Sequence, residues 1–269
     1  MQTGVSTASL FLRAYNEEAL PILNELGVTT AELFLTTFSE YGKGFAQKIK
    51  KVQGNIRLHS FHVLNTQYEP QLFNAHPRVR ADAYGWLERA LQGANELQIP
   101  RYTFHGTARV KRDSRSGEKD NFPVIIEGFS QIAALCEKYG VTLCLENVEW
   151  STYNREGVFA KIASEVPTLK GVLDIKQARI SGTPYQNYLA EMQGKIEHVH
   201  LSDLDENGKM CLPGTGTFDF DTLIKRLKDS GFDGALLIEV YKDDYQNVAD
   251  LKRSCNYLDE LLYKYGANG

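Results

Sequence analysis

Short apolar runs alternate with longer amphipathic stretches along the whole chain, and this alternation constrains the fold more than any other feature. Seven runs have strand length and are rich in β-branched or aromatic residues, with a weaker one, "TGVSTAS", near the start. They lie at 30–35, 56–62, 101–106, 141–147, 171–175, 196–202 and 234–240. Eight strand-then-helix units of roughly 34 residues predict a single (β/α)8 TIM barrel over residues 1–269.

A doubly wound sheet has the same alternation, so periodicity does not separate the two folds. The chain has no glycine-rich phosphate loop after the first run, which weakens a dinucleotide-binding sheet. Glycines end two of the expected helices, at Gly140 and Gly231. No low-complexity linker divides the 269 residues, which are enough for one large barrel. The barrel is therefore the favoured architecture.

Composition excludes several classes of protein. The net charge of −4 and the absence of a long basic run argue against a nucleic-acid partner. The N-terminus lacks the basic start and apolar core of a signal peptide, and no apolar run is long enough for a bilayer. Four scattered cysteines without a CxxC pair indicate reduced thiols. A soluble cytoplasmic protein without a membrane partner is expected, and a homo-oligomer is compatible with the sequence.

Metal-binding or proton-transferring side chains end most of the later apolar runs. They are His62, His105, Glu146, Asp174, His200 and Glu239. A single polar residue at a strand end is usually unremarkable, but in a barrel the strand ends converge on one mouth. A buried charge also needs a partner or a metal. Three carboxylates and one imidazole (Glu146, Asp174, Glu239, His200) predict one divalent ion, Mn²⁺ first, with Mg²⁺, Co²⁺ or Zn²⁺ as alternatives.

Five ordered motifs carry a family resemblance over nearly the whole chain: "LCLENV", "GVLDIKQA", "HVHLSD", "PGTGTFDF" and "LLIEVY". In this set the sequence resembles the xylose isomerase-like TIM barrels, the sugar phosphate isomerase/epimerase superfamily. That superfamily also includes ketose 3-epimerases, inosose dehydratases and endonuclease IV. The resemblance implies a shared metal on Glu146, Asp174, His200 and Glu239. It also implies a small carbohydrate substrate, with Glu146 and Glu239 as the catalytic acid/base pair of an isomerase or epimerase that forms an enediolate.

The chain departs from the ketose 3-epimerase pattern at two positions. Gln177 stands where those enzymes carry a substrate-binding histidine, and the loop before Pro213 has no arginine, Lys209 being its nearest cation. A metal-dependent lyase or dehydratase on a keto-sugar or inosose-like substrate is therefore the alternative. An endonuclease IV-like nuclease is less favoured, because the loop has Asp203 and Asp205 but no histidine. A non-catalytic sugar-binding barrel is disfavoured because the four ligands are intact.

Several further side chains receive weaker expectations. His62, His105 and Gln177 are predicted to contact substrate, although a capped strand-end histidine is the plain alternative for the first two. His198 is expected inside the barrel below His200. Asp203 and Asp205 are expected in a solvated turn. Trp150 and Tyr153 could form a wall for a sugar ring or cover the following helix, and the polar loop 106–122 is expected over the mouth.

Overall fold

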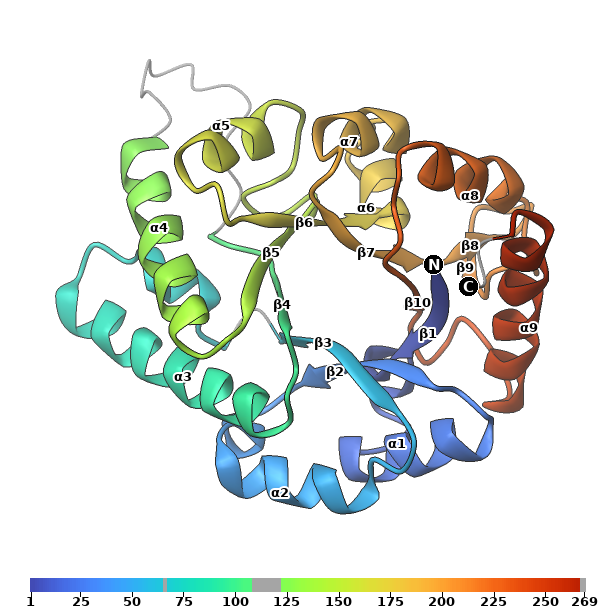
Figure 1. The fold of residues 1–269 in the computed structure, drawn as a ribbon, viewed down its shortest axis with the longest axis horizontal. Helices are drawn as coiled ribbons and strands as arrows, with labels where there is room; N and C mark the ends of the chain where they lie inside the picture. Colours follow the sequence, from blue (N-terminus) through green and yellow to red (C-terminus); the bar gives the residue numbers. More distant parts are fainter. Residues whose placement is uncertain (65–66, 108–121, 267–269) are drawn as a thin grey trace.

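Eight parallel strands close into a barrel in this computed structural model, which describes residues 1–64, 67–107 and 122–266. The order around the barrel is β1-β10-β7-β6-β5-β4-β3-β2 (Figure 1). The strands are β1 (Gln2–Ser6), β2 (Thr30–Leu35), β3 (Arg57–Val63), β4 (Arg101–Phe104), β5 (Thr142–Glu146), β6 (Lys170–Asp174), β7 (Ile196–Leu201) and β10 (Ala235–Ile238). The predicted (β/α)8 barrel is confirmed, and the weak first run is its opening strand.

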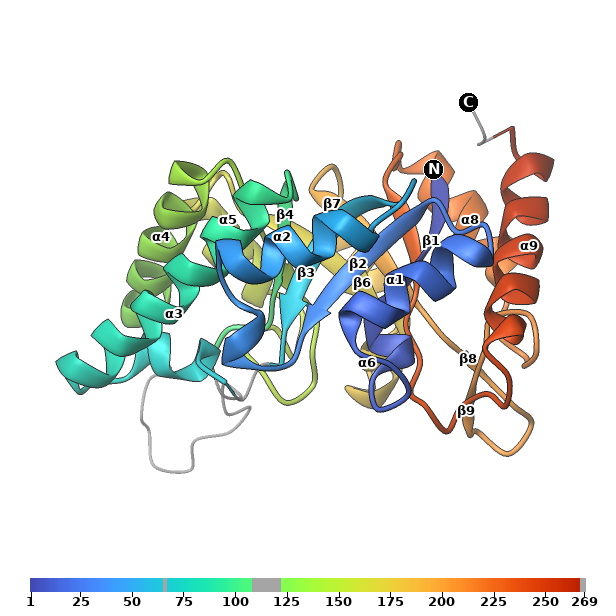
Figure 2. The same cartoon turned by 90° about the horizontal axis from the view of Figure 1, so that it is seen from below.

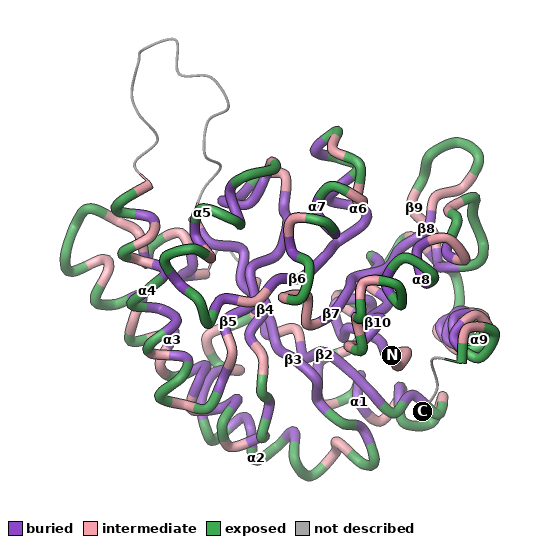
Figure 3. Tube along the Cα trace, turned by 45° about the horizontal axis from the view of Figure 1, so that its top comes forward, coloured by how far each residue is buried: buried purple, intermediate pink, exposed green. Residues whose placement is uncertain are grey.

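Helices surround the barrel because each has one apolar face to bury against the strands (Figure 1). In the described residues they are α1 (Asn16–Glu25), α2 (Lys43–Val52), α3 (Pro77–Glu96), α4 (Phe122–Lys138), α5 (Val158–Glu165), α6 (Ile175–Ile180), α7 (Tyr185–Glu191), α8 (Phe220–Asp229) and α9 (Ala249–Lys264), with short 3₁₀ turns η1 (Thr7–Leu10), η2 (Phe38–Glu40) and η3 (Glu69–Phe73). Figure 3 shows the buried strands inside and the exposed outer helix faces. None of the helices within the described ranges combines the length and apolarity needed to cross a membrane.

The strand register places the polar strand ends at one level. Asp174 of β6 pairs with His200 of β7. His200 in turn pairs with Leu237 of β10, and Leu237 precedes Glu239 by two residues. Because the strands are parallel, their C-terminal ends share one end of the barrel. Figure 2 shows this end below, with α6 and the small β8–β9 hairpin, opposite the N-terminus.

Asp203 organises the loop that joins β7 to α8, and it is buried at 1% exposure. It lies in β8 (Asp203–Leu204), which pairs with β9 (Met210–Cys211). Its carboxylate accepts four backbone N–H groups, from Leu204, Gly214, Gly216 and Phe218, at 2.7–3.1 Å. A Cβ at Gly216 would lie 2.2 Å from the carbonyl oxygen of Leu204. The expected solvated turn is therefore wrong for Asp203, because backbone donors take the place of water.

Replacing Asp203 by Asn is expected to lower the free energy of unfolding by about 3 kcal/mol, because one oxygen with two N–H partners becomes an NH₂ group. Asp205→Asn is the matched control: Oδ1 of Asp205 accepts the N–H groups of Asn207 and Lys209, and an Asn carbonyl can accept both. Urea denaturation of the two variants measures the difference. Equal stabilities would contradict the assigned role of Asp203.

His59 of β3 is a buried histidine whose two ring nitrogens have no hydrogen-bond partner in the described part of the chain. Its ring contacts His198 edge-on at 5.2 Å between centroids. Burial, together with repulsion from His198, Arg101 and Arg57, lowers the pKa of His59 to about 2. The folded protein therefore keeps this imidazole neutral across the ordinary pH range.

Acid is expected to destabilise the protein through His59. In the unfolded chain this residue gains a proton below about pH 6.5, whereas the folded chain does not. The unfolded state then binds more protons, so stability falls by about 1.4 kcal/mol per pH unit below that point. Between pH 6.5 and 4.5, the free energy of unfolding of His59→Leu should therefore fall by about 2 to 3 kcal/mol less than that of wild type, as measured by urea denaturation. His76→Leu, at an exposed position, is the control, and its stability should change with pH as that of wild type does. The same pH dependence for His59→Leu and wild type would contradict the role assigned to His59.

Candidate metal centre

Four side chains from four strand ends converge at the mouth of the barrel. Glu146 ends β5, Asp174 ends β6, His200 lies in β7 and Glu239 follows β10. Each offers one ligand atom, and these atoms all lie within 4.8 Å of one another. Glu146, Asp174 and His200 are buried, and the side chain of Glu239 is 13% exposed. The structure thus brings together the four residues predicted as metal ligands.

Carboxylate oxygens contact both ring nitrogens of His200, Nε2 through Glu32 at 3.0 Å and Nδ1 through Glu146 and Glu239. Nδ1 lies 3.0 Å from Oε1 of Glu146 and 2.6 Å from Oε2 of Glu239, but only the first contact has hydrogen-bond geometry. Oε2 of Glu239 is buried without a hydrogen-bond donor among the described residues. A buried carboxylate oxygen without a donor is costly, and a cation between these atoms would remove the cost. One nitrogen and three carboxylates form the ligand set of a hard divalent ion, so the residues fit the predicted metal.

The titration of the centre reflects its excess of acidic groups. The pKa of Asp174 is raised to about 7, mainly by burial and also by the charges of Glu146 and Glu239, against the opposing effects of Lys176 and His200. Burial opposes a charged imidazole, but Glu239, Glu32 and Glu146 outweigh it and raise the pKa of His200. Without a bound ion, a protonated His200 thus supplies the positive charge beside these carboxylates. A divalent ion would supply that charge in its place.

Asn147 holds the ends of β5 and β6 in register. Its Nδ2 donates to the carbonyl oxygen of Asp174 at 2.8 Å, and its Oδ1 accepts the N–H of Asp174 at 2.7 Å. The side chain of Asp174 also accepts the N–H of Gln177 at 2.8 Å and so caps α6. These bonds fix the position of Asp174 beside Glu146, and they explain structurally the "LEN" and "LDIKQ" motifs.

Glu32 of β2 is a fully buried carboxylate that the sequence interpretation did not include in the site. It accepts hydrogen bonds from Ser60 (2.8 Å) and Thr103 (2.7 Å) and contacts Nδ1 of His62 at 2.7 Å. With His198 and His200 it forms a second group that could hold an ion. Its oxygens already have donors, so it is better described as the network behind His200. The available signal was a glutamate inside the apolar run "TAELFL".

His198 lies in this network, as predicted for an interior residue. It is fully buried, and its Nε2 lies 2.9 Å from Oγ1 of Thr103 and 3.3 Å from Oε2 of Glu32. Burial lowers the pKa of His198, so the ring is neutral. The network supports His200 from the inner side of the barrel.

His105 bridges a second unexpected carboxylate to the centre. Nδ1 lies 2.8 Å from Glu69, which is fully buried and also accepts a hydrogen bond from Tyr102 at 2.6 Å. Nε2 lies 3.2 Å from Oε2 of Glu146. Burial opposes protonation, but Glu69 and Glu146 raise the pKa of His105 to about 10. His105 is therefore a cationic donor aimed at Glu146, which differs from a plain capped strand end.

A cavity of about 180 Å³ is lined by three of the four predicted ligands, Glu146, Asp174 and Glu239. It is lined by all three residues predicted to contact substrate, His62, His105 and Gln177, and by Trp150. Tyr153 is not among its lining residues: that ring is fully buried against Phe159 and Tyr188 and donates to Glu191 at 2.8 Å. Most of the loop 106–122 lies outside the described residues.

Lys176 and Tyr241 also line the cavity and were missed in the sequence interpretation. Burial opposes the positive charge of Lys176, but Asp174 and Glu239 raise its pKa above the ordinary value. Lys176 is therefore a cation in the wall of the cavity. Lys209, the cation nearest in sequence to the missing arginine, is instead exposed in the β8–β9 turn.

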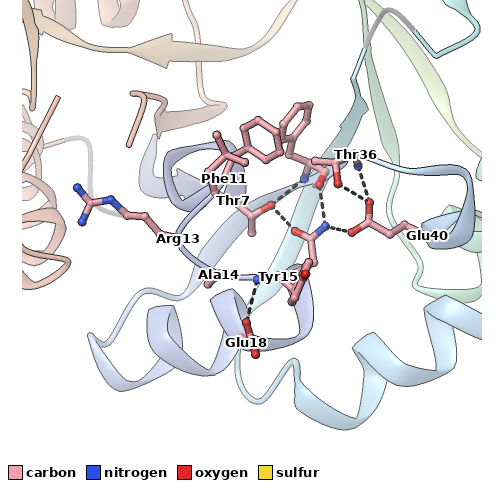
Figure 4. A pocket seen from close by; sticks show the side chains of 11 residues that line it. Thr7, Phe11, Arg13, Ala14, Tyr15, Glu18, Thr36 and Glu40 are labelled. Atoms are coloured by element: carbon pink, nitrogen blue, oxygen red, sulfur yellow. Dashed lines mark hydrogen bonds between the residues drawn. The ribbon is translucent and has the colours of Figure 1, made fainter. Parts of the chain in front are cut away.

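A larger cavity of about 350 Å³ lies beside the first, between the loop after η1 and β2 (Figure 4). Phe11 and Phe34 line both cavities. The polar side chains that line the larger cavity form hydrogen bonds with one another: Thr7 donates to Asn16 at 2.7 Å, and Asn16 donates to Glu40 at 3.0 Å. The reactive groups therefore gather in the smaller cavity over the strand ends.

Comparison with known proteins agrees with this architecture. Residues 20–261 match the family model described as xylose isomerase-like TIM barrel. The chain is 25% identical over 171 residues to an inosose dehydratase of Erwinia tasmaniensis, covering 52% of this chain and 55% of that one. The match thus spans about half the length of that relative. The chain is also 22% identical over 192 residues to the L-ribulose-5-phosphate 3-epimerase UlaE of Shigella flexneri serotype 5b, and this match covers 70% of this chain and 66% of UlaE.

Solved structures share the fold over nearly their full lengths. A D-tagatose 3-epimerase-like protein superposes with a TM-score of 0.79 at 19% identity, covering 98% of this chain and 97% of that one. The IOLI protein, solved with a bound zinc atom, superposes with a TM-score of 0.78 at 15% identity, covering 98% and 99%. These two likenesses establish a common barrel.

Proposed function

We propose that this chain, which belongs to the xylose isomerase-like TIM barrel family, is a divalent-metal-dependent isomerase or epimerase of a small sugar or sugar phosphate. The observation that carries the proposal is the convergence of Glu146, Asp174, His200 and Glu239 at the barrel mouth. An epimerase among the sequence relatives supports the reaction class. Mn²⁺ is the ion we assign, because three of the four ligands are carboxylates.

Glu146 and Glu239 are the acid/base pair in this proposal. Glu146 ends β5 and Glu239 follows β10, and β6 and β7 separate these two strands around the barrel. Their carboxylates can therefore approach a substrate from different sides. One takes the proton from the carbon next to a carbonyl, and the C–H electron pair forms the new C=C bond of an enediolate. The other returns a proton to the opposite face. A divalent ion held by Glu146, Asp174, His200 and Glu239 would polarise the carbonyl group.

The residues around the cavity would orient the substrate. His105, held by Glu69, can donate a hydrogen bond to substrate, as can the side-chain amide of Gln177. His62 is held by Glu32, and its ring contacts the tilted ring of Phe34 at 4.4 Å between centroids. Trp150 presents a partly exposed ring next to His105. Polar donors beside aromatic surfaces suit a small carbohydrate.

A metal-dependent lyase on the same site is the second candidate. The inosose dehydratase relative favours it, and so do Gln177 and the missing arginine before Pro213. A lyase would use the same first step, removal of the α-proton. The electron pair would then form a C=C bond to the β-carbon and break its bond to a leaving group, such as a hydroxyl that takes up a proton and departs as water.

Solvent-deuterium exchange tests the proposal and separates the candidates. The protein loaded with Mn²⁺ is incubated in D₂O with ketoses, ketose phosphates and inososes, and products are followed by NMR. Deuterium at the α-carbon without loss of water is the result expected for an isomerase or epimerase. Elimination products would assign the lyase instead. Absence of both with every carbonyl compound would overturn the proposed proton abstraction.

A further inference from the structure

Lys176 is a buried cation that the acid/base pair and the predicted metal ligands leave without a function. It lies in the first turn of α6, two residues after Asp174, and its side chain is 8% exposed. It lines the same cavity as Glu146 and Glu239. Among the described residues around that cavity, it is the only lysine or arginine.

Among the described residues, the ammonium group of Lys176 makes only long polar contacts, one of them a 3.5 Å hydrogen bond to Tyr241. Nζ lies 3.7 Å from Oδ2 of Asp174 and 3.5 Å from the hydroxyl of Tyr241. Ordinary N–H···O bonds measure 2.7–3.2 Å, and an ammonium can donate three of them. A buried ammonium with such long contacts is costly unless another acceptor enters the cavity.

Tyr241 contacts the ammonium group of Lys176 but gives it no short hydrogen bond. Nζ lies 4.7 Å from the centre of the Tyr241 ring, within cation–π distance. This contact keeps the amine beside Asp174 and in the cavity wall. The donors that remain are available to an oxygen atom of a bound molecule.

We propose that Lys176 binds the substrate oxygen that becomes negatively charged when the α-proton is removed. This inference rests on the proposed function. As a carboxylate takes the proton, the C–H pair forms the C=C bond and the C=O π pair moves onto oxygen. Lys176 donates a hydrogen bond to that oxygen and keeps its own proton. The substrate class is thus a carbonyl compound with an acidic α-hydrogen, and Lys176 takes the place of the arginine absent from the loop.

A purely structural ion pair with Asp174 is the competing role for Lys176, and Lys176→Met separates the two. Methionine keeps the length of the side chain and removes its charge. We expect the kcat of deuterium exchange to fall about 10- to 100-fold, as for a lost hydrogen bond to a charged group. Mn²⁺ affinity, measured by calorimetry, should stay equal or rise, because a nearby positive charge is lost. A fall in Mn²⁺ affinity that matches the fall in exchange would overturn the inference.

A binding measurement makes the test independent of the reaction. Acetohydroxamate is a small planar anion that resembles an enediolate, and its affinity for the Mn²⁺-loaded protein is measured by calorimetry. Lys176→Met should weaken it about 10- to 100-fold. Lys209→Met, which removes an exposed cation from the neighbouring turn, should not change it. Lys176→Gln repeats the measurement if the methionine variant fails to fold.

The two readouts distinguish failure of this inference from failure of the proposed function. If wild type exchanges no substrate but Lys176→Met still weakens hydroxamate binding, the reaction is wrong and the anion-binding role of Lys176 stands. If wild type exchanges and Lys176→Met keeps both exchange and hydroxamate affinity within about threefold, Lys176 has no such role and the reaction stands.

Discussion

Glu146→Gln and Glu239→Gln should each lower the rate of epimerisation at least about 1,000-fold, because each removes one member of the acid/base pair. The variants are assayed at saturating Mn²⁺, with metal content measured for each, since both residues are also predicted ligands. A two-base mechanism makes a sharper prediction. Each variant should still exchange the α-proton of one epimer with solvent, because the other glutamate is intact.

Glu206→Gln is the matched control, since it makes the same chemical change at an exposed position in the β8–β9 turn. It should keep the wild-type rate. Full epimerisation by Glu146→Gln or Glu239→Gln with normal metal content would exclude the assigned pair. Loss of exchange from both epimers in one variant would instead assign a single base to both faces.

Binding of Mn²⁺ should raise the melting temperature by about 5 to 10 °C at a free metal concentration of about 100 times Kd. Binding only to the folded state contributes about 2.7 kcal/mol at that concentration, and each kcal/mol shifts the melting temperature of a large domain by about 2 to 4 °C. The physical source is the crowded carboxylates: Oε2 of Glu239 is buried without a donor among the described residues. A chelator should reverse the shift and abolish activity, and added Mn²⁺ should restore both.

Asp174→Asn should remove most of this metal-dependent shift, because it deletes one charge from the predicted ligand set. Asp205→Asn removes the same charge from a half-buried position in the β8–β9 turn and should leave the shift unchanged. Differential scanning fluorimetry with and without Mn²⁺ compares the three proteins. An equal shift for Asp174→Asn and wild type would place the ion elsewhere, and no shift in wild type would count against the metal site itself.

The strand ends were the most predictable part of the molecule. Glu146, Asp174, His200 and Glu239 each stand at or just beyond the end of an apolar run, and parallel strands bring such ends together. His198 was also predictable inside the barrel, because side chains two residues apart on a strand point the same way. These inferences use only local periodicity and the closure of the barrel.

Residues whose role depends on long-range partners were missed or misjudged. Glu32 acquires its role from Thr103 and His62, and Glu69 from His105, across 30 to 71 positions of sequence. Asp203 looked like a solvated turn residue, but donors up to 15 positions away surround it. Local patterns contain no information about which distant N–H or imidazole group will face a carboxylate.

The amino-acid sequence by itself determined the barrel and the acidic, histidine-containing character of its mouth. The hydrophobic periodicity of the sequence predicts which segments form strands and which form helices. The polar residues that end the apolar runs can likewise be read directly from the sequence. Only the tertiary structure decided how the charges are balanced. Closure of the barrel placed Glu32 behind His200 and Glu69 behind His105, and it left the ammonium group of Lys176 in the cavity without a close acceptor among the described residues. Electrostatic interactions depend on distances between atoms and on burial, and folding alone sets both.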